Sequence, residues 1–101
     1  MDTIQLIADT KARFSHNSAK AYLKDKYTSK LLVADQGGLW TAGPQLLSLL
    51  STSSGKTVVI IDMFDNPVKV NRRDLLLKLT ETYNNIMAEW HSEWELLEKK
   101  R

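Results

Sequence analysis

The segment Gly55-Lys56-Thr57 has the residue types of a phosphate-binding loop, in which backbone amides and a lysine hold phosphate oxygens. That loop also requires a glycine five residues before Gly55, where this chain has Leu50. It follows a strand and opens a helix, whereas here a β-branched run typical of a strand comes after the segment. The sequence therefore excludes a nucleotide-binding loop at this position.

Asp62 ends the most apolar run of the chain, and an apolar strand ending in aspartate is also found in haloacid-dehalogenase-type phosphatases. Those enzymes place a second aspartate two residues on, and Phe64 stands there instead. A chain of 101 residues is also too short for their fold. We therefore expect Asp62 to accept a hydrogen bond or to face solvent near a strand end.

The remaining groups that could do chemistry are few. Glu95 lies one helical turn after His91, a spacing typical of a weak surface pair, and no third metal ligand accompanies it. Glu93 and Glu95 point in different directions on a helix, so they do not form an acid–base pair. The chain has no cysteine, which excludes a disulfide framework and a thiolate metal site. We therefore predict a non-enzymatic protein with no catalytic residue, no metal and no cofactor.

The length predicts a single domain over residues 1–101. No window approaches the roughly 18 apolar residues that cross a bilayer, and the N-terminus lacks the basic start and apolar run of a signal peptide. We therefore expect a soluble, cytoplasmic protein with no membrane partner. The net charge of +2 is too small to imply a polyanion as the partner.

Hydrophobic periodicity predicts an α+β fold in three segments. Residues 1–29 should be helical, with a break or bend at residues 15–18, where serine and asparagine side chains favour local hydrogen bonds. Residues 30–55 should form a hairpin and a short helix, with Gly37-Gly38 in the turn. Residues 56–101 should form a second hairpin and then a long C-terminal helix. The first strand of this hairpin, residues 57–64, is β-branched and nearly all apolar, so we expect it to be central.

The two hairpin–helix units align with each other, since residues 31–50 match residues 60–79 in the order of strand, turn, strand and leucine pair. One such unit cannot bury its own apolar face. We therefore expect the two units to share one small antiparallel sheet, with the helices on one side of it.

The last helix should begin after Asn71, a capping residue, and it has neither glycine nor proline as far as Lys100. At 1.5 Å per residue it would be roughly 43 Å long. A compact domain of this size is only about 35 Å across. The helix should therefore project beyond the rest of the domain.

The projecting end of this helix carries four large apolar side chains among acidic ones: Met87, Trp90, Trp94 and Leu97. Two interpretations stay open. The N-terminal helices fold back over these side chains, or the side chains bind a protein, since tryptophan is a favoured anchor residue. On the second interpretation the chain is a protein-interaction or assembly module, and its partner is another copy, most simply in a dimer, or a different protein.

A nucleic-acid-binding accessory protein is the alternative function. Lys69, Arg72 and Arg73 lie where a strand leads into the start of the last helix. Backbone amides at a helix N-terminus, together with arginines, hold phosphate. The helix dipole also disfavours cations at that end. Helix stability therefore does not explain why two arginines stand there.

The sequence from Asp62 to Asn71, Asp-Met-Phe-Asp-Asn-Pro-Val-Lys-Val-Asn, precedes a long helix with Tyr83, Trp90 and Trp94. It resembles small accessory modules of tailed bacteriophages, found at the C-termini of tail-fibre-associated proteins. In those modules a strand ending in Asp-x-x-Gly/Asn-x-Pro-Val leads into a cap and an amphipathic helix. The resemblance covers residues 60–101 and departs from the pattern at Arg72-Arg73. It implies a structural, assembly or host-factor-binding role in the host cytoplasm and no catalytic residue.

Overall fold

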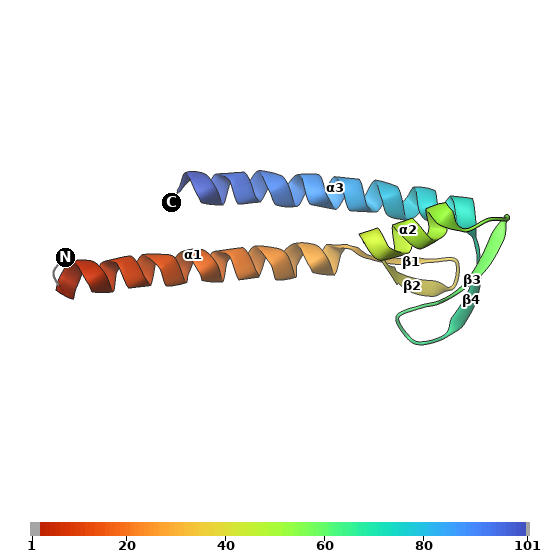
Figure 1. The fold of residues 1–101 in the computed structure, drawn as a ribbon, viewed down its shortest axis with the longest axis horizontal. Coiled ribbons are helices and arrows are strands. Elements are labelled where there is room, and N and C mark those ends of the chain that lie inside the picture. The colour runs from red at the N-terminus through yellow and green to blue at the C-terminus, as the bar shows by residue number, and fades with distance from the viewer. Residues whose placement is uncertain (1–2, 101) are drawn as a thin grey trace.

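The computed structural model describes the backbone of residues 3–100 and the side chains of residues 15–100. This part of the chain forms three helices and two β-hairpins (Figure 1). In chain order they are α1 (Thr3–Lys30), β1 (Leu32–Asp35), β2 (Gly38–Thr41), α2 (Pro44–Thr52), β3 (Thr57–Ile61), β4 (Pro67–Asn71) and α3 (Arg72–Lys99). The predicted α+β fold and the long C-terminal helix are therefore confirmed.

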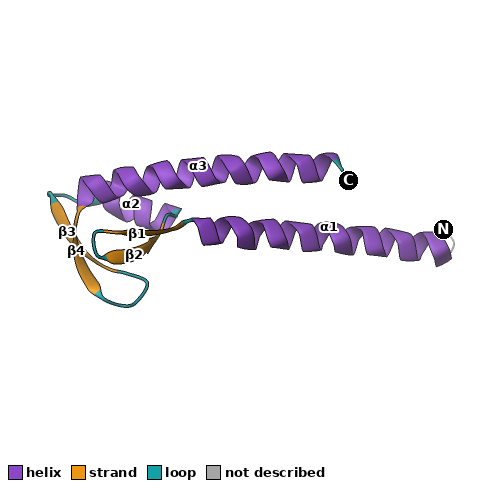
Figure 2. Cartoon of the chain, turned by 180° about the vertical axis from the view of Figure 1, so that it is seen from behind, coloured by secondary structure: helices purple, strands orange, loops and turns teal. Residues whose placement is uncertain are grey.

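The molecule is long and narrow, with extents of 65, 25 and 20 Å. Both hairpins and α2 lie at one end, while α1 and α3 run side by side and antiparallel away from them (Figures 1 and 2). We call the hairpins, α2 and α3 up to Ile86 the head, and α1 with the rest of α3 the helical arm. The predicted projection of α3 is thus present, but α1 accompanies it and reaches further (Figure 1).

The first hairpin pairs β1 with β2 in an antiparallel register that sets Val33 opposite Trp40. Its turn has positive φ at two residues, Gln36 (49°) and Gly37 (80°). Such a turn matches the twist of the strands it joins, and glycine adopts it without steric cost. Gly38 serves a different purpose, because a Cβ atom there would lie 2.5 Å from the indole of Trp40. The absence of a side chain lets that ring pack against the backbone.

The second hairpin pairs β3 with β4, also antiparallel, with Val59 opposite Lys69. α3 begins directly after β4, and the Asn71 side chain accepts a hydrogen bond from the Asp74 amide at 3.0 Å. This contact satisfies an amide that has no partner within the helix. The predicted cap is therefore confirmed, and it fixes where strand becomes helix.

The hydrophobic core lies in the head, where α2 and the first turns of α3 pack against both hairpins. Its buried members are Leu31, Val33, Trp40, Ala42, Leu50, Ile60, Val70, Leu75 and Leu79. Each hairpin contributes the residues of one face, as the alternation of side chains along a strand requires. α3 contributes residues one turn apart, which lie on one stripe of the helix.

The prediction that the two hairpins share one sheet is wrong: they form two separate two-stranded sheets. The free edge of β2 meets the loop after β3 and no strand. The Leu39 amide donates to Asp62 Oδ2 at 3.2 Å, and the Met63 amide donates to the Leu39 carbonyl at 3.0 Å. A carboxylate and a loop amide thus take the positions that a neighbouring strand would occupy.

The prediction of a break at residues 15–18 is also wrong, because α1 is one continuous helix. Ser15, Asn17 and Ser18 are exposed, while His16 is half-buried and lies toward α3, with Nε2 3.3 Å from Glu98 Oε1. Packing along α3 outweighs the small helix propensity of the polar residues.

Candidate functional site

The helical arm brings two of the four predicted interaction residues, Trp90 and Trp94, against or near α1. Trp90 stacks on Tyr27 of α1, with ring centroids 6.1 Å apart and planes inclined by 10°. Tyr27 is buried, and Leu23, one turn before it, is buried as well. Trp90 therefore lies between the two helices, so α1 does fold back over part of the apolar stripe.

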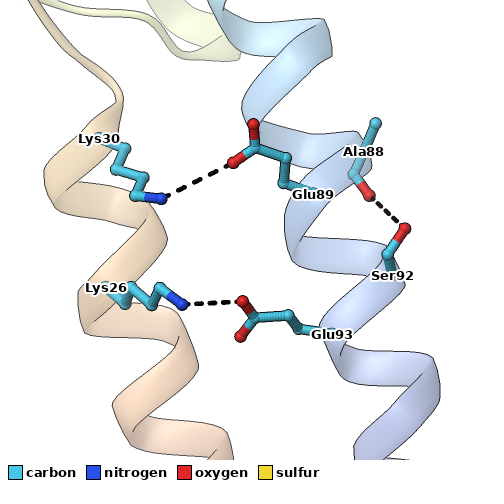
Figure 3. Close-up of polar contacts among 6 residues, drawn as sticks. All are labelled: Lys26, Lys30, Ala88, Glu89, Ser92 and Glu93. Atoms are coloured by element: carbon cyan, nitrogen blue, oxygen red, sulfur yellow. Dashed lines mark hydrogen bonds and ion pairs between the residues drawn. The ribbon is translucent and has the colours of Figure 1, made fainter.

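Ion pairs flank this stacked pair and join the helices (Figure 3). Lys26 Nζ lies 2.8 Å from Glu93 Oε1, and Lys30 Nζ lies 3.7 Å from Glu89 Oε2. The hydrogen bonds from Lys26 and Tyr27 hold the pKa of Glu93 below its ordinary value of 4.5. The same carboxylate raises the pKa of Lys26 above 10.5.

Trp94 remains open to solvent on this arm. Its side chain is 40% exposed, and its ring stacks on His91 at a centroid distance of 5.8 Å. It borders a hollow of about 310 Å³ between the helices, lined by Lys20, Ala21, Leu23, Lys24, Trp90 and Trp94. Met87 and Leu97, the other two predicted residues, are half-buried on α3. The open part of the predicted surface is therefore centred on Trp94.

Of the three residues of the predicted nucleic-acid contact, Arg72 is bound to backbone carbonyl groups. Arg72 Nε donates to the Gly55 carbonyl at 2.9 Å, and its Nη1 donates to the Leu50 carbonyl at 2.8 Å. These bonds satisfy backbone groups at and beyond the C-terminal turn of α2, so Arg72 joins α2 to the start of α3. Lys69 and Arg73 are exposed. The nucleic-acid alternative stays a prediction, and Arg72 already has a structural role.

Asp62 is buried and acts as a hydrogen-bond acceptor, one of the two outcomes expected for it. Its Oδ1 accepts from the amides of Asn66 and Phe64, both at 3.0 Å, and its Oδ2 accepts from Leu39. The bonds from Asn66, Leu39 and Phe64 hold the pKa of Asp62 below its ordinary value of 3.8. The carboxylate therefore closes the β3–β4 turn and joins it to the first hairpin.

A second concave surface lies in the head and was not predicted. It is an open groove of about 740 Å³ between β2, the start of α2 and the end of β3. Its apolar members include Leu39, Leu46, Leu49, Ile61 and Met63. Ile61 and Met63 belong to the run of residues 57–64, which the sequence predicted to be a central strand. The groove was missed because a two-stranded sheet leaves one face of such a strand uncovered, and the sequence of the strand does not show how many strands its sheet has.

Within the described residues, no three histidine or acidic side chains lie close enough together to hold a metal ion. No helix in that same part of the chain is both long and apolar enough to span a membrane.

The fold and the surfaces above define a small α+β protein with a hairpin head and a two-helix arm. Comparisons with protein-family models, with curated proteins and with solved structures give no match for this chain. The resemblance to bacteriophage accessory modules therefore stays a prediction.

Proposed function

We propose that this chain is a non-enzymatic protein-interaction or assembly module that docks through its helical arm. The observation that carries the proposal is the exposed Trp94 at the hollow between α1 and α3. A tryptophan beside an open apolar hollow is the kind of anchor on which binding energy concentrates. Since α1 already covers Trp90, the docking surface is smaller than the full stripe of four residues.

The chemistry around the hollow indicates what kind of partner fits. Lys20 and Lys24 lie on the α1 side of it, and both are exposed. A protein segment that inserts one apolar side chain between two carboxylates would contact Trp94 and pair with both lysines. The α3 surface of a second copy offers exposed acidic residues, which include Glu81 and Glu95. Self-association through the arm is therefore tested first.

The test is the solution mass, measured by light scattering coupled to size exclusion over a range of protein concentrations. The wild-type chain should associate beyond its 11.5 kDa monomer. Trp94→Ala should remove the association that the arm provides, because the anchor is lost. The circular dichroism spectrum of this variant should stay helical. Leu96→Ala, the matched control, deletes another exposed apolar side chain of α3 and should change nothing.

Two results would overturn the proposal. One is an assembly that Trp94→Ala leaves unchanged at every concentration. The other is a monomeric wild-type chain to which peptides with an apolar residue between two acidic ones bind no better than scrambled peptides.

A further inference from the structure

The two strands of the second hairpin each have one edge without a partner strand, because the sheet ends there on both sides. The Arg72 amide donates to the Lys56 carbonyl, and the Asp62 amide donates to the Asn66 carbonyl. Hydrogen-bonded and non-hydrogen-bonded pairs alternate along an antiparallel ladder. The backbone N–H and C=O groups of the even-numbered residues of β3 therefore point toward β4. The backbone groups that point away from β4 belong to Thr57, Val59 and Ile61.

The outer edge of β4 is blocked at each of its three outward positions. Pro67 has no amide hydrogen to donate, and Lys69 is charged and exposed. At Asn71 the side chain of Gln36 makes two hydrogen bonds with the backbone: its Oε1 accepts from the amide at 2.6 Å, and its Nε2 donates to the carbonyl at 3.2 Å. Proline, lysine and a covering group are the usual means by which proteins prevent pairing at an edge.

The outer edge of β3 has none of these features. The strand contains neither a charge nor a proline, and its outward residues are β-branched. Val59 is 59% exposed and Ile61 is 69% exposed. The open stretch ends at Met63, whose amide bonds to the Leu39 carbonyl. An uncharged, apolar and unpaired edge of this kind favours the addition of another strand.

We propose that β3 pairs in antiparallel fashion with β3 of a second copy, centred on Val59. The two hairpins then form one four-stranded sheet in the order β4-β3-β3-β4. In this register Val59 lies opposite Val59, and Thr57 lies opposite Ile61 of the other copy. All three outward positions become hydrogen-bonded pairs, and the apolar side chains on the exposed face contact their cross-strand neighbours.

Three features favour a second copy over an unrelated peptide. The open stretch is symmetric about Val59, which a two-fold interface requires. In this register no like charges meet at the ends of the strand, because Lys56 falls opposite Asp62. The hairpin also lies at the end of the molecule opposite to the free ends of the arm (Figure 1), so the two arms do not obstruct the approach.

Light scattering on the full chain tests this interface. The wild-type chain should contain a dimer of about 23 kDa, twice its 11.5 kDa mass. Val59→Lys sets two lysines opposite each other at the centre, so it should raise the dimer dissociation constant by roughly tenfold or more. Leu77→Lys adds the same charge at an exposed site on α3 and should leave the dimer unchanged. Circular dichroism verifies that both variants fold.

Cross-linking tests the register independently. The chain has no cysteine, so single replacements report one position each. A short bis-maleimide should link Val59→Cys into a covalent dimer, because the two residues face each other. Lys69→Cys should not link, since three strand spacings, about 14 Å, separate the two copies of that residue. Equal linking of both variants, or a dimer that Val59→Lys does not weaken, would overturn the β3 interface.

The interface does not depend on the function proposed for the arm, and the variants separate the two. Loss of association in Val59→Lys alone supports the β3 dimer and contradicts self-association of the arm. Loss in Trp94→Ala alone does the reverse. A wild-type chain that is monomeric at all concentrations, or that binds an extended apolar peptide along β3 without dimerising, overturns the dimer.

Discussion

The head and the helical arm are held together by different kinds of contact. The head contains the nine buried apolar residues of the core, two backbone ladders and the buried carboxylate of Asp62. Among the described side chains of the arm, Leu23 and Tyr27 are the buried apolar ones. The rest of the arm depends on the Tyr27–Trp90 stack and on ion pairs at its rim.

This difference indicates where the stability of the chain resides. Burial of apolar side chains contributes most of the free energy of folding and is insensitive to salt at moderate ionic strength. Exposed ion pairs contribute little and are screened. We therefore expect the arm to open locally while the head stays folded, because regions with few buried contacts open at lower free energy. An arm that opens locally on a stable head is compatible with the docking role proposed for it, because a docking element must adapt to its partner.

The largest expected effect comes from the core of the head. Leu79→Ala removes a fully buried side chain of α3 and should lower the free energy of unfolding by about 2–5 kcal/mol. Leu77→Ala makes the same change two residues away, where the side chain is exposed, and should cost less than about 0.5 kcal/mol. Urea unfolding followed by circular dichroism measures both. Equal losses would mean that burial in the core does not determine the stability of the head.

A smaller effect is expected at Asp62, where the head depends on a charge. Its folded pKa lies below 3.8, so its contribution to stability is present above that pH and is lost as the pH falls through the folded value. Asp62→Asn removes the charge that three amides bind, so the variant should be less stable at neutral pH and should lose less stability in acid. Thermal unfolding at a series of pH values measures this.

Asp65→Asn is the matched control for this prediction. Asp65 is exposed in the same turn, with φ of 62°, a conformation that asparagine tolerates. This variant should keep the acid sensitivity of the wild-type chain. If both variants lose the acid-dependent component, the effect does not originate at Asp62.

The local elements could be predicted from the sequence because their signals are local. The glycine turn, the apolar β3 run and the Asn71 cap each act within a few residues, and the structure has the corresponding hairpins and helix start. The predicted break at residues 15–18 also rests on a local signal. The continuous helix there makes contacts with residues distant in the sequence, such as that of His16 with Glu98, which a local signal does not include. Local propensity is a weak guide where packing on another helix decides.

The candidate surfaces show the same limit. The sequence identified Trp90 and Trp94 together, and only the placement of α1 separates the covered one from the exposed one. Similarly, the apolar run of β3 predicted a central strand with neighbours on both sides. The side-chain pattern of a strand does not reveal how many strands its sheet has, so the free edge of β3 could not be predicted.

The smallest expected effect, and the most direct test of the difference between arm and head, concerns Glu93. Glu93→Gln removes the charge that Lys26 and Tyr27 bind, so amide hydrogens of α1 near Lys26 should exchange roughly two- to fivefold faster. Amides of β3 and β4 should exchange at unchanged rates. Glu95→Gln, the control, alters an exposed carboxylate that pairs within α3 with His91. It should leave α1 unchanged.

The same contact predicts how the arm responds to pH and salt. The contribution of Glu93 is present above its ordinary value of 4.5 and is lost as the pH falls through its lower folded pKa. The contribution of Lys26 is present below 10.5 and is lost as the pH rises through its higher folded pKa. Between these limits, raising the salt concentration should speed exchange in α1 of the wild-type chain and have less effect in Glu93→Gln. Equal salt sensitivity of arm and head would mean that the ion pairs do not hold the helices together.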